Sequence, residues 1–277
     1  MDHLAEKYLH PRKIPSTACS GCGLGQVHKK VLLAIEESGL GLDDVVWGTG
    51  IGCAGRQTFH TWRGDNFAGT HGRVYALATG LRVALPPEKK IVLTVGDGDA
   101  FGIGLLHLLH CARRNLGITV VVADNFGYQS TGGQFGYTTP PGMVTDSSPY
   151  GNREPGWFSE GSDIFAILKD AGATFLARHS SFDGEEAVKS LVLALANPGF
   201  SLVHIIYPCV THFGAVSLKT RDREEIYRWF AGIFAEGEHP GPHFQSGIYH
   251  DARGKRPEFA SALREWTKEF GREAGRA

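Results

Sequence analysis

Short runs of five or six buried-type residues recur along the chain, and helical patterns separate them. The runs at 91–95 and 118–123 are rich in β-branched residues and do not alternate with polar ones. That pattern is typical of strands buried on both faces of a parallel sheet. Between them, residues 100–115 have helical length and place Ile103, Leu106 and Leu109 on one side. Because a helix between two buried strands is a crossover, this stretch predicts one complete βαβ unit.

The same patterns predict an α/β fold for most of the chain. We expect a mostly parallel, doubly wound sheet with helices on both faces over residues 1–214, and a helical extension over 215–277 that packs on the same domain or on a partner subunit. Further strands are expected at 44–48, 174–177 and 201–206, and further helices at 24–37, 70–86, 163–172, 185–196, 223–234 and 258–270. Irregular segments are expected at 1–15, 60–70 and 135–157, and we expect the last of these, which carries prolines and aromatics, to form a wall over a site or a subunit contact.

Polar residues follow the two strands of the βαβ unit. Asp97 comes after the first and Asn125 after the second, so both lie at the carboxyl edge of the sheet, where open α/β sheets bind their ligands. One carboxylate and one amide oxygen hold Mg²⁺ when phosphates complete its coordination. Gly96 and Gly98 let the backbone approach a phosphate, and a helix starting near Ala100 would aim its N-terminal amides at it. We therefore expect this site to bind a diphosphate.

Composition narrows the class of protein. The 277 residues carry a net charge of −1 with no long block of one sign, which argues against a nucleic-acid surface or an anionic membrane partner. No apolar run approaches the roughly 20 residues that span a bilayer, and the first residues lack the apolar core of a signal peptide. We therefore expect a cytoplasmic protein, in which the five cysteines are candidates for metal ligation rather than for disulfides.

Four of these cysteines fall in loops that the predicted strands place at the same edge. Cys19 and Cys22 form a C-x-x-C motif ahead of a helix, which suits a redox dithiol, half of a zinc site or half of an iron–sulfur site. Cys53 and Cys209 each follow a predicted strand, whereas Cys111 lies in the middle of a helix among apolar neighbours and is expected to be a buried bystander. Four thiolates suit zinc or a [4Fe–4S] cluster, and the ligand count does not separate the two.

The motif Gly96-Asp97-Gly98, followed after this interval by Asp124-Asn125, resembles the metal–diphosphate motif of thiamine diphosphate enzymes. Tyr128 and the residues 131–134 that follow are similar to one branch, the β subunits of the 2-oxoacid:ferredoxin oxidoreductases. The resemblance covers most of residues 16–214. It implies that Asp97, Asn125 and the backbone carbonyl of Gly127 hold Mg²⁺ on the cofactor, and that Cys19, Cys22, Cys53 and Cys209 hold a [4Fe–4S] cluster.

The resemblance also implies contacts with the cofactor and two candidate catalytic residues. His71 would hydrogen-bond the cofactor or a reacting oxygen, although it could equally cap a helix. Arg56 would bind a substrate carboxylate, although a surface arginine is the alternative; a distal carboxylate there would favour 2-oxoglutarate over pyruvate. The residues expected to bind thiamine diphosphate are Gly52, Gly96, Asp97, Gly98, Asp99, Ala100, Asn125, Tyr128 and Thr131.

The implied activity is the coenzyme A-dependent oxidative decarboxylation of a 2-oxoacid to acyl-CoA and CO₂, with electrons passing through the cluster to ferredoxin. Because a single sheet accounts for nearly all of the chain, we expect a partner α subunit to supply the pyrimidine-type domain and its glutamate, and a dimer of such α–β pairs. Two alternatives remain: a non-redox thiamine diphosphate decarboxylase or synthase component with structural cysteines, and a non-catalytic metal-binding scaffold subunit. A nicotinamide-binding Rossmann protein fits poorly, because no G-x-G-x-x-G with an acidic residue at the required distance follows the first strand.

Overall fold

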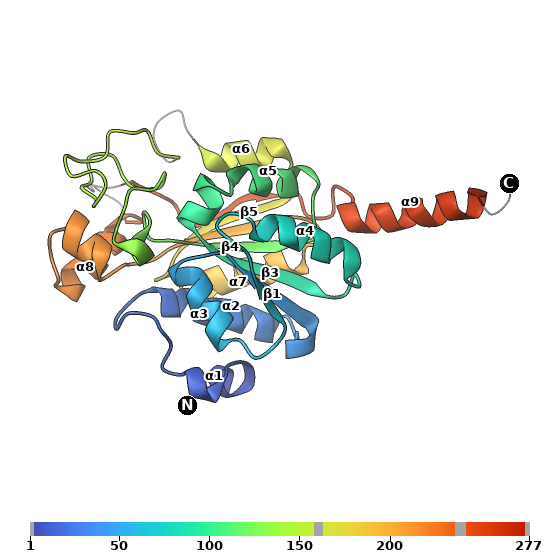
Figure 1. The fold of residues 1–277 in the computed structure, drawn as a ribbon, viewed down its shortest axis with the longest axis horizontal. Helices are drawn as coiled ribbons and strands as arrows, with labels where there is room; N and C mark the ends of the chain where they lie inside the picture. Colours follow the sequence, from blue (N-terminus) through green and yellow to red (C-terminus); the bar gives the residue numbers. More distant parts are fainter. Residues whose placement is uncertain (1–2, 158–162, 236–241, 275–277) are drawn as a thin grey trace.

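The sheet has seven strands, and six of them run parallel (Figure 1). The computed structural model describes residues 3–157, 163–235 and 242–274. In spatial order the strands are β2 (Asn66–Ala68), β1 (Val45–Thr49), β3 (Lys90–Gly96), β4 (Thr119–Asp124), β6 (Ser201–Ile206), β5 (Phe175–Ser180) and β7 (Gly247–Asp251), of which β7 alone is antiparallel to its neighbour. The predicted parallel α/β sheet is confirmed.

Helices cover both faces of the sheet (Figure 1). One layer contains α1 (His3–Tyr8), α2 (Leu24–Glu37), α3 (Cys53–Thr61) and α7 (Glu185–Ala196). The other contains α4 (Val74–Ala84), α5 (Leu105–Arg113) and α6 (Ile164–Ala171). Side chains of β4 alternate between the two cores, with Val121 and Ala123 facing the first layer and Val120 and Val122 the second. This strand is buried on both faces, which explains its continuous apolar sequence.

The C-terminal region differs from the expected helical extension, because it contributes a strand to the sheet. Residues 247–251 form β7, which pairs with β5 at the edge. The helix α8 (Arg223–Gly232) packs its Ile226 and Phe230 into a small core with Phe126. The helix α9 (Phe259–Ala274) begins against the domain and then extends away from it (Figure 1), leaving Trp266 61% exposed. The helix α8 therefore packs on the same domain, whereas α9 does so only at its start.

Several elements fall where irregular structure was expected. The arm at 1–15 contains α1, anchored by the buried side chains of Leu4 and Tyr8. The segment 60–70 contains β2, an edge strand of only three residues, and is preceded by α3. The buried face of α3 is polar, since Gln57, Thr58 and Thr61 are all buried, so no apolar stripe marked it. The helix α5 begins at Leu105 rather than near residue 100. Residues 98–102 instead form a π-helical turn, which is wider than an α-helical turn.

Asn115 ties the end of α5 to three other parts of the chain. Its side-chain oxygen accepts hydrogen bonds from the Thr174 hydroxyl and the Phe200 amide, each at 2.9 Å. Its side-chain nitrogen donates to the carbonyls of Arg256 and Pro257, each at 3.1 Å. The residue is 1% exposed and adopts a φ of 50°, a left-handed conformation that asparagine tolerates better than most residues. One side chain thus joins α5 to β5, β6 and the segment leading to α9.

We expect Asn115→Ala to lower the free energy of unfolding by about 3 kcal/mol or more, because the change leaves buried donors and acceptors without partners. Urea unfolding of the purified protein measures this. Asn66→Ala on the exposed strand β2 is the matched control, with an expected change within about 0.5 kcal/mol. Equal stability of the two variants would show that the Asn115 network does not stabilise the fold.

Candidate active site at the carboxyl edge of the sheet

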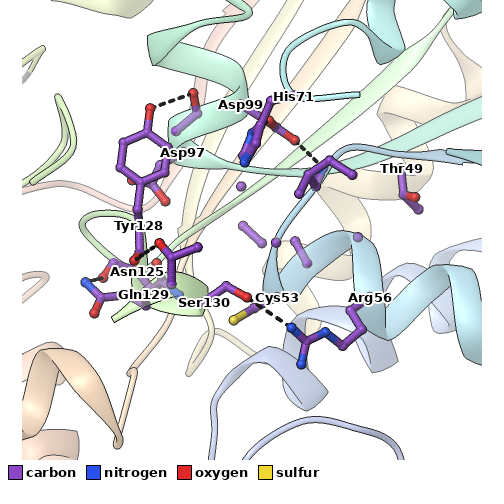
Figure 2. A pocket seen from close by; sticks show the side chains of 18 of the residues that line it. Thr49, Cys53, Arg56, His71, Asp97, Asp99, Asn125, Tyr128, Gln129 and Ser130 are labelled. Carbon is purple, nitrogen blue, oxygen red and sulfur yellow. Dashed lines mark hydrogen bonds and ion pairs between the residues drawn. The ribbon is translucent and has the colours of Figure 1, made fainter. Parts of the chain in front are cut away.

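A cavity of about 520 Å³ opens at the carboxyl ends of β1, β3 and β4 (Figure 2). The strands are parallel and in register, so the loops that follow them meet at this edge. Ala100, an expected cofactor contact, is fully buried and does not line the cavity, because it lies inside the π turn. The residues expected from the sequence that do line it are Gly52, Cys53, Arg56, His71, Gly96, Asp97, Gly98, Asp99, Asn125, Gly127, Tyr128 and Thr131.

Two buried carboxylates lie close together at the ends of β3 and β4. Asp97 is 3% exposed and Asp124 is fully buried. Burial, and then the nearby charge of Asp124, raises the pKa of Asp97 well above its ordinary value. The hydroxyl of Thr138 donates to Oδ2 of Asp97 at 2.7 Å and also stabilises the carboxylate of Asp124. A cation between these groups and a diphosphate would offset the cost of their burial.

A buried chain of side chains holds Asp124 from the opposite side. Arg178 Nε lies 3.1 Å from His204 Nδ1, and His204 Nε2 lies 2.8 Å from Asp124 Oδ2. Because the Arg178 Nε–H can only donate, Nδ1 accepts and Nε2 carries the proton that is donated to Asp124. Burial, and then the neighbouring guanidinium of Arg178, holds the pKa of His204 well below its ordinary value. His204 is therefore neutral, and its tautomer is set by its two partners.

Asn125 is held by a tyrosine that the sequence analysis did not single out. Its side-chain nitrogen donates to the hydroxyl of Tyr207 at 2.6 Å, which leaves its amide oxygen as the atom able to bind a cation. Tyr207 follows β6, so the rule that strand ends meet at one edge could have identified it. Gly127 adopts a φ of 141°, and a Cβ there would come within 2.6 Å of the carbonyl oxygen of Gln134. Glycine is therefore required where the chain turns around this site.

His71 lies on the same side of the cavity as Asp99 (Figure 2). Its Nδ1 is hydrogen-bonded to Asp99 Oδ1, and the Gly72 amide donates to the same oxygen at 3.1 Å. The Ile51 amide donates to Asp99 Oδ2 at 2.7 Å. Asp99 thus joins the loops after β1 and before α4 to the turn after β3. The alternative that His71 caps α4 is wrong, because the N-cap position is Arg73, without a side-chain hydrogen bond.

The four cysteines from distant loops border a second cavity, of about 220 Å³. Cys19 is exposed, Cys22 and Cys53 are partly buried, and Cys209 is buried. Burial raises the pKa of the Cys22 thiol to about 12. Among the described residues, no group of three or more histidine, cysteine, aspartate or glutamate side chains is placed to hold a metal ion. Cys111 is buried on α5, does not line this cavity, and contacts Thr79 on α4 instead.

The two cavities share a wall. Arg56 reaches from α3 to Ser130, with Nη2 donating to Oγ at 3.2 Å (Figure 2), and the Ser130 hydroxyl also hydrogen-bonds the Cys53 thiol. Burial raises the pKa of the Tyr207 hydroxyl, and the nearby thiols and Asp97 raise it further. Arg56 is exposed, yet it lines both cavities. The residues common to both linings are Cys53, Arg56, Asn125, Gln129 and Ser130.

The chain is similar to known proteins of one family. Residues 47–205 match the family model of the thiamine pyrophosphate enzyme C-terminal, TPP-binding domain. The chain is 35% identical to the 2-oxoglutarate synthase subunit KorB of Methanocaldococcus jannaschii, over 81% of this chain and 80% of the relative. It is 38% identical to the subunit of the same name from Archaeoglobus fulgidus, over 74% of each chain.

A solved structure also resembles the chain over nearly its whole length. It is the 2-oxoglutarate:ferredoxin oxidoreductase of Magnetococcus marinus, with 2-oxoglutarate, coenzyme A and succinyl-CoA bound. The TM-score is 0.81 and the identity is 26%, and the match covers 98% of this chain and 92% of that one. The fold expected from the resemblance is confirmed.

We expect Tyr207→Phe to weaken the binding of magnesium–thiamine diphosphate by about tenfold or more, because residues behind a metal ligand orient it. The change removes the acceptor of the Asn125 side-chain nitrogen, so the amide oxygen loses its fixed direction. Isothermal titration of the cofactor in the presence of Mg²⁺ measures the effect. Tyr150→Phe, at a side chain that is 90% exposed, is the control. Wild-type affinity in Tyr207→Phe would refute the orienting role of the hydroxyl.

Proposed function

The chain belongs to the β subunits of the 2-oxoacid:ferredoxin oxidoreductases, and from this we propose that it oxidises a 2-oxoacid to its acyl-CoA and CO₂. The larger cavity would hold thiamine diphosphate with Mg²⁺, and the thiol cavity a [4Fe–4S] cluster. The single observation that carries the proposal is the wall that the two cavities share. Groups bound on either side of this wall would be close enough to exchange electrons.

The residues of the larger cavity suit a magnesium-bound diphosphate. Asp97, the amide oxygen of Asn125 and the carbonyl of Gly127 would hold Mg²⁺, an oxygen donor set of the kind that this ion prefers. The buried and mutually repelling carboxylates of Asp97 and Asp124 support a cation there. When bound, thiamine diphosphate supplies the nucleophilic carbon and the electron sink for decarboxylation. The flanking residues expected to contact it are Gly52, Gly96, Gly98, Asp99, Tyr128 and Thr131.

His71 would move or hold a proton at the reacting oxygen of the substrate. Its Nδ1 is fixed on the buried carboxylate of Asp99, which orients the ring and leaves Nε2 to act. A histidine positioned in this way is suited to take a proton from a reacting oxygen at Nε2 and to return it. Closing the cavity with a partner subunit would exclude water from this step.

Arg56 would bind the carboxylate of the substrate that lies far from the carbonyl. Its guanidinium is exposed at the shared wall and is directed by Ser130. A planar guanidinium binds a carboxylate with two parallel hydrogen bonds. This assignment favours 2-oxoglutarate over pyruvate, in agreement with the 2-oxoglutarate synthase relatives and with the ligand of the Magnetococcus structure.

The thiol cavity suits an inorganic cluster better than a redox dithiol that binds no metal. Four thiols from three separate segments surround one space, and burial raises the pKa of Cys22, Cys53 and Cys209. Thiolates in such a place need a positive centre, which an iron–sulfur cluster provides. A non-redox component or a scaffold subunit would not need these thiols beside the cofactor cavity. A reducing cytoplasm would keep them available.

A partner subunit is needed to complete the site. The described residues form a single sheet, and the family expectation is an α subunit with a pyrimidine-type domain and its glutamate. We propose a dimer of α–β pairs that acts on a 2-oxoacid and coenzyme A and reduces ferredoxin. Within the described residues, no helix is both long and apolar enough to cross a bilayer.

The metal content of the co-expressed pair tests the cluster. We expect about four iron atoms and four sulfides per β chain under anaerobic conditions. Cys209→Ser should lose most of this iron, because it removes one thiolate ligand. Cys111→Ser is the matched control and should retain it, since Cys111 does not line the thiol cavity. Colourless protein loaded with zinc, or full iron content in Cys209→Ser, would exclude the proposed cluster.

Turnover of the same pair tests the substrate. For Arg56→Gln we expect kcat/KM for 2-oxoglutarate to fall about 10- to 100-fold, the value of a lost charge-assisted hydrogen bond of about 1.5–3 kcal/mol. Pyruvate lacks the distal carboxylate, so its kcat/KM should change less than about threefold. An equal loss of kcat/KM for both substrates would show that Arg56 acts on the chemistry rather than on the distal carboxylate. An unchanged kcat/KM for 2-oxoglutarate would show that Arg56 is a surface arginine that does not bind the substrate.

A further inference from the structure

A third cavity, of about 450 Å³, opens beside the thiol cavity at the surface of the protein. Cys19, Thr211 and His212 line both cavities, so the two are neighbours. Cys19 is exposed, in contrast to the buried Cys209. Cys19 is therefore the most exposed of the four thiols, and it lies where the thiol cavity adjoins the surface cavity. An electron leaving a cluster held by these thiols would have its shortest route to solvent here.

Two unpaired arginines stand at the rim of this surface cavity. Arg221 and Arg223 are exposed, and within the described residues neither guanidinium has an ion-pair or hydrogen-bond partner. None of the acidic residues next to them in sequence lines this cavity, and each has a hydrogen-bond or ion-pair partner elsewhere. Asp222 caps α8 through the Glu224 amide at 2.8 Å, Glu224 pairs with Arg228 at 2.8 Å, and Glu225 accepts a hydrogen bond from the Thr220 hydroxyl at 2.6 Å.

Arg223 is held against the loop that carries the first two cysteines. A Cβ on Gly21, which lies between Cys19 and Cys22, would come 3.2 Å from Cδ of Arg223. On the next turn of α8, the hydroxyl of Tyr227 donates to the Gly21 carbonyl at 2.9 Å. The start of α8 thus lies on the C-x-x-C loop and places a positive charge beside it. The charge is positioned by packing and carries no partner of its own.

We propose that this surface, defined by Cys19, His212, Arg221 and Arg223, is the docking site of a small acidic iron–sulfur protein of the ferredoxin type. The inference rests on the proposed function, because it assumes a cluster in the thiol cavity. Unpaired positive charges steer an acidic partner to a site and fix its orientation there. Oxidation of one 2-oxoacid releases two electrons, so two one-electron carriers would each take one electron in turn, and no bond would form or break at this surface.

The double variant Arg221→Glu with Arg223→Glu, in the co-expressed pair, tests the proposal. With a ferredoxin as acceptor at low ionic strength, we expect kcat/KM for the carrier to fall at least about tenfold, because steering contributes about 10- to 1000-fold to association. The loss should shrink as salt is added, since exposed charges are screened. With methyl viologen, a small cation that needs no protein docking, the rate should stay at the wild-type value, as should the iron content.

The double variant Lys169→Glu with Lys255→Glu is the matched control. It makes the same change of net charge at exposed residues outside the proposed surface, and its ferredoxin kinetics should stay close to wild type. Unchanged ferredoxin kinetics in the arginine variant, or an equal loss with viologen or in the KM for coenzyme A, would overturn the docking site. A wild-type pair that reduces neither acceptor would instead refute the proposed function, so the two failures are distinguishable.

Discussion

The arrangement of the site depends on two carboxylates that are buried close together at the ends of neighbouring strands. Burial and the charge of Asp124 raise the pKa of Asp97, and the two carboxylates are held by a hydroxyl from Thr138 and by a neutral His204 that Arg178 contacts. These partners orient the carboxylates without neutralising both. The oxygen atoms offered at this edge are the kind that bind a hard divalent cation. This supports the proposed magnesium–diphosphate site.

The parallel sheet explains how a second centre comes to lie beside the first. Every loop that follows a parallel strand emerges at the same edge, so Cys53 after β1 and Cys209 after β6 flank the residues that follow β3 and β4. Arg56 and Ser130 then line both cavities. In the proposed function, the substrate, the cofactor and the cluster are therefore neighbours. Cys19 is the most exposed of the four thiols.

Much of this arrangement could be predicted from the sequence, because it depends on strand ends and on motifs of fixed spacing. The buried strands β3 and β4, their crossover helix, and the convergence of Asp97 with Asn125 are confirmed in the structure. The helix α3 was missed because its buried face is polar, and β2 and β7 because short edge strands bury little apolar surface. Thr138 and Ser130 gave no signal, since each lies in a loop whose path only the folded chain defines.

We propose that a cofactor in the larger cavity delivers electrons directly to an inorganic centre in the thiol cavity. Electron paramagnetic resonance of the anaerobic α–β pair tests this claim most directly. With 2-oxoglutarate added and no external acceptor present, we expect the signal of a reduced [4Fe–4S] cluster. This signal should appear only when thiamine diphosphate and Mg²⁺ are bound. A cluster that stays oxidised while CO₂ is released from the substrate would contradict it.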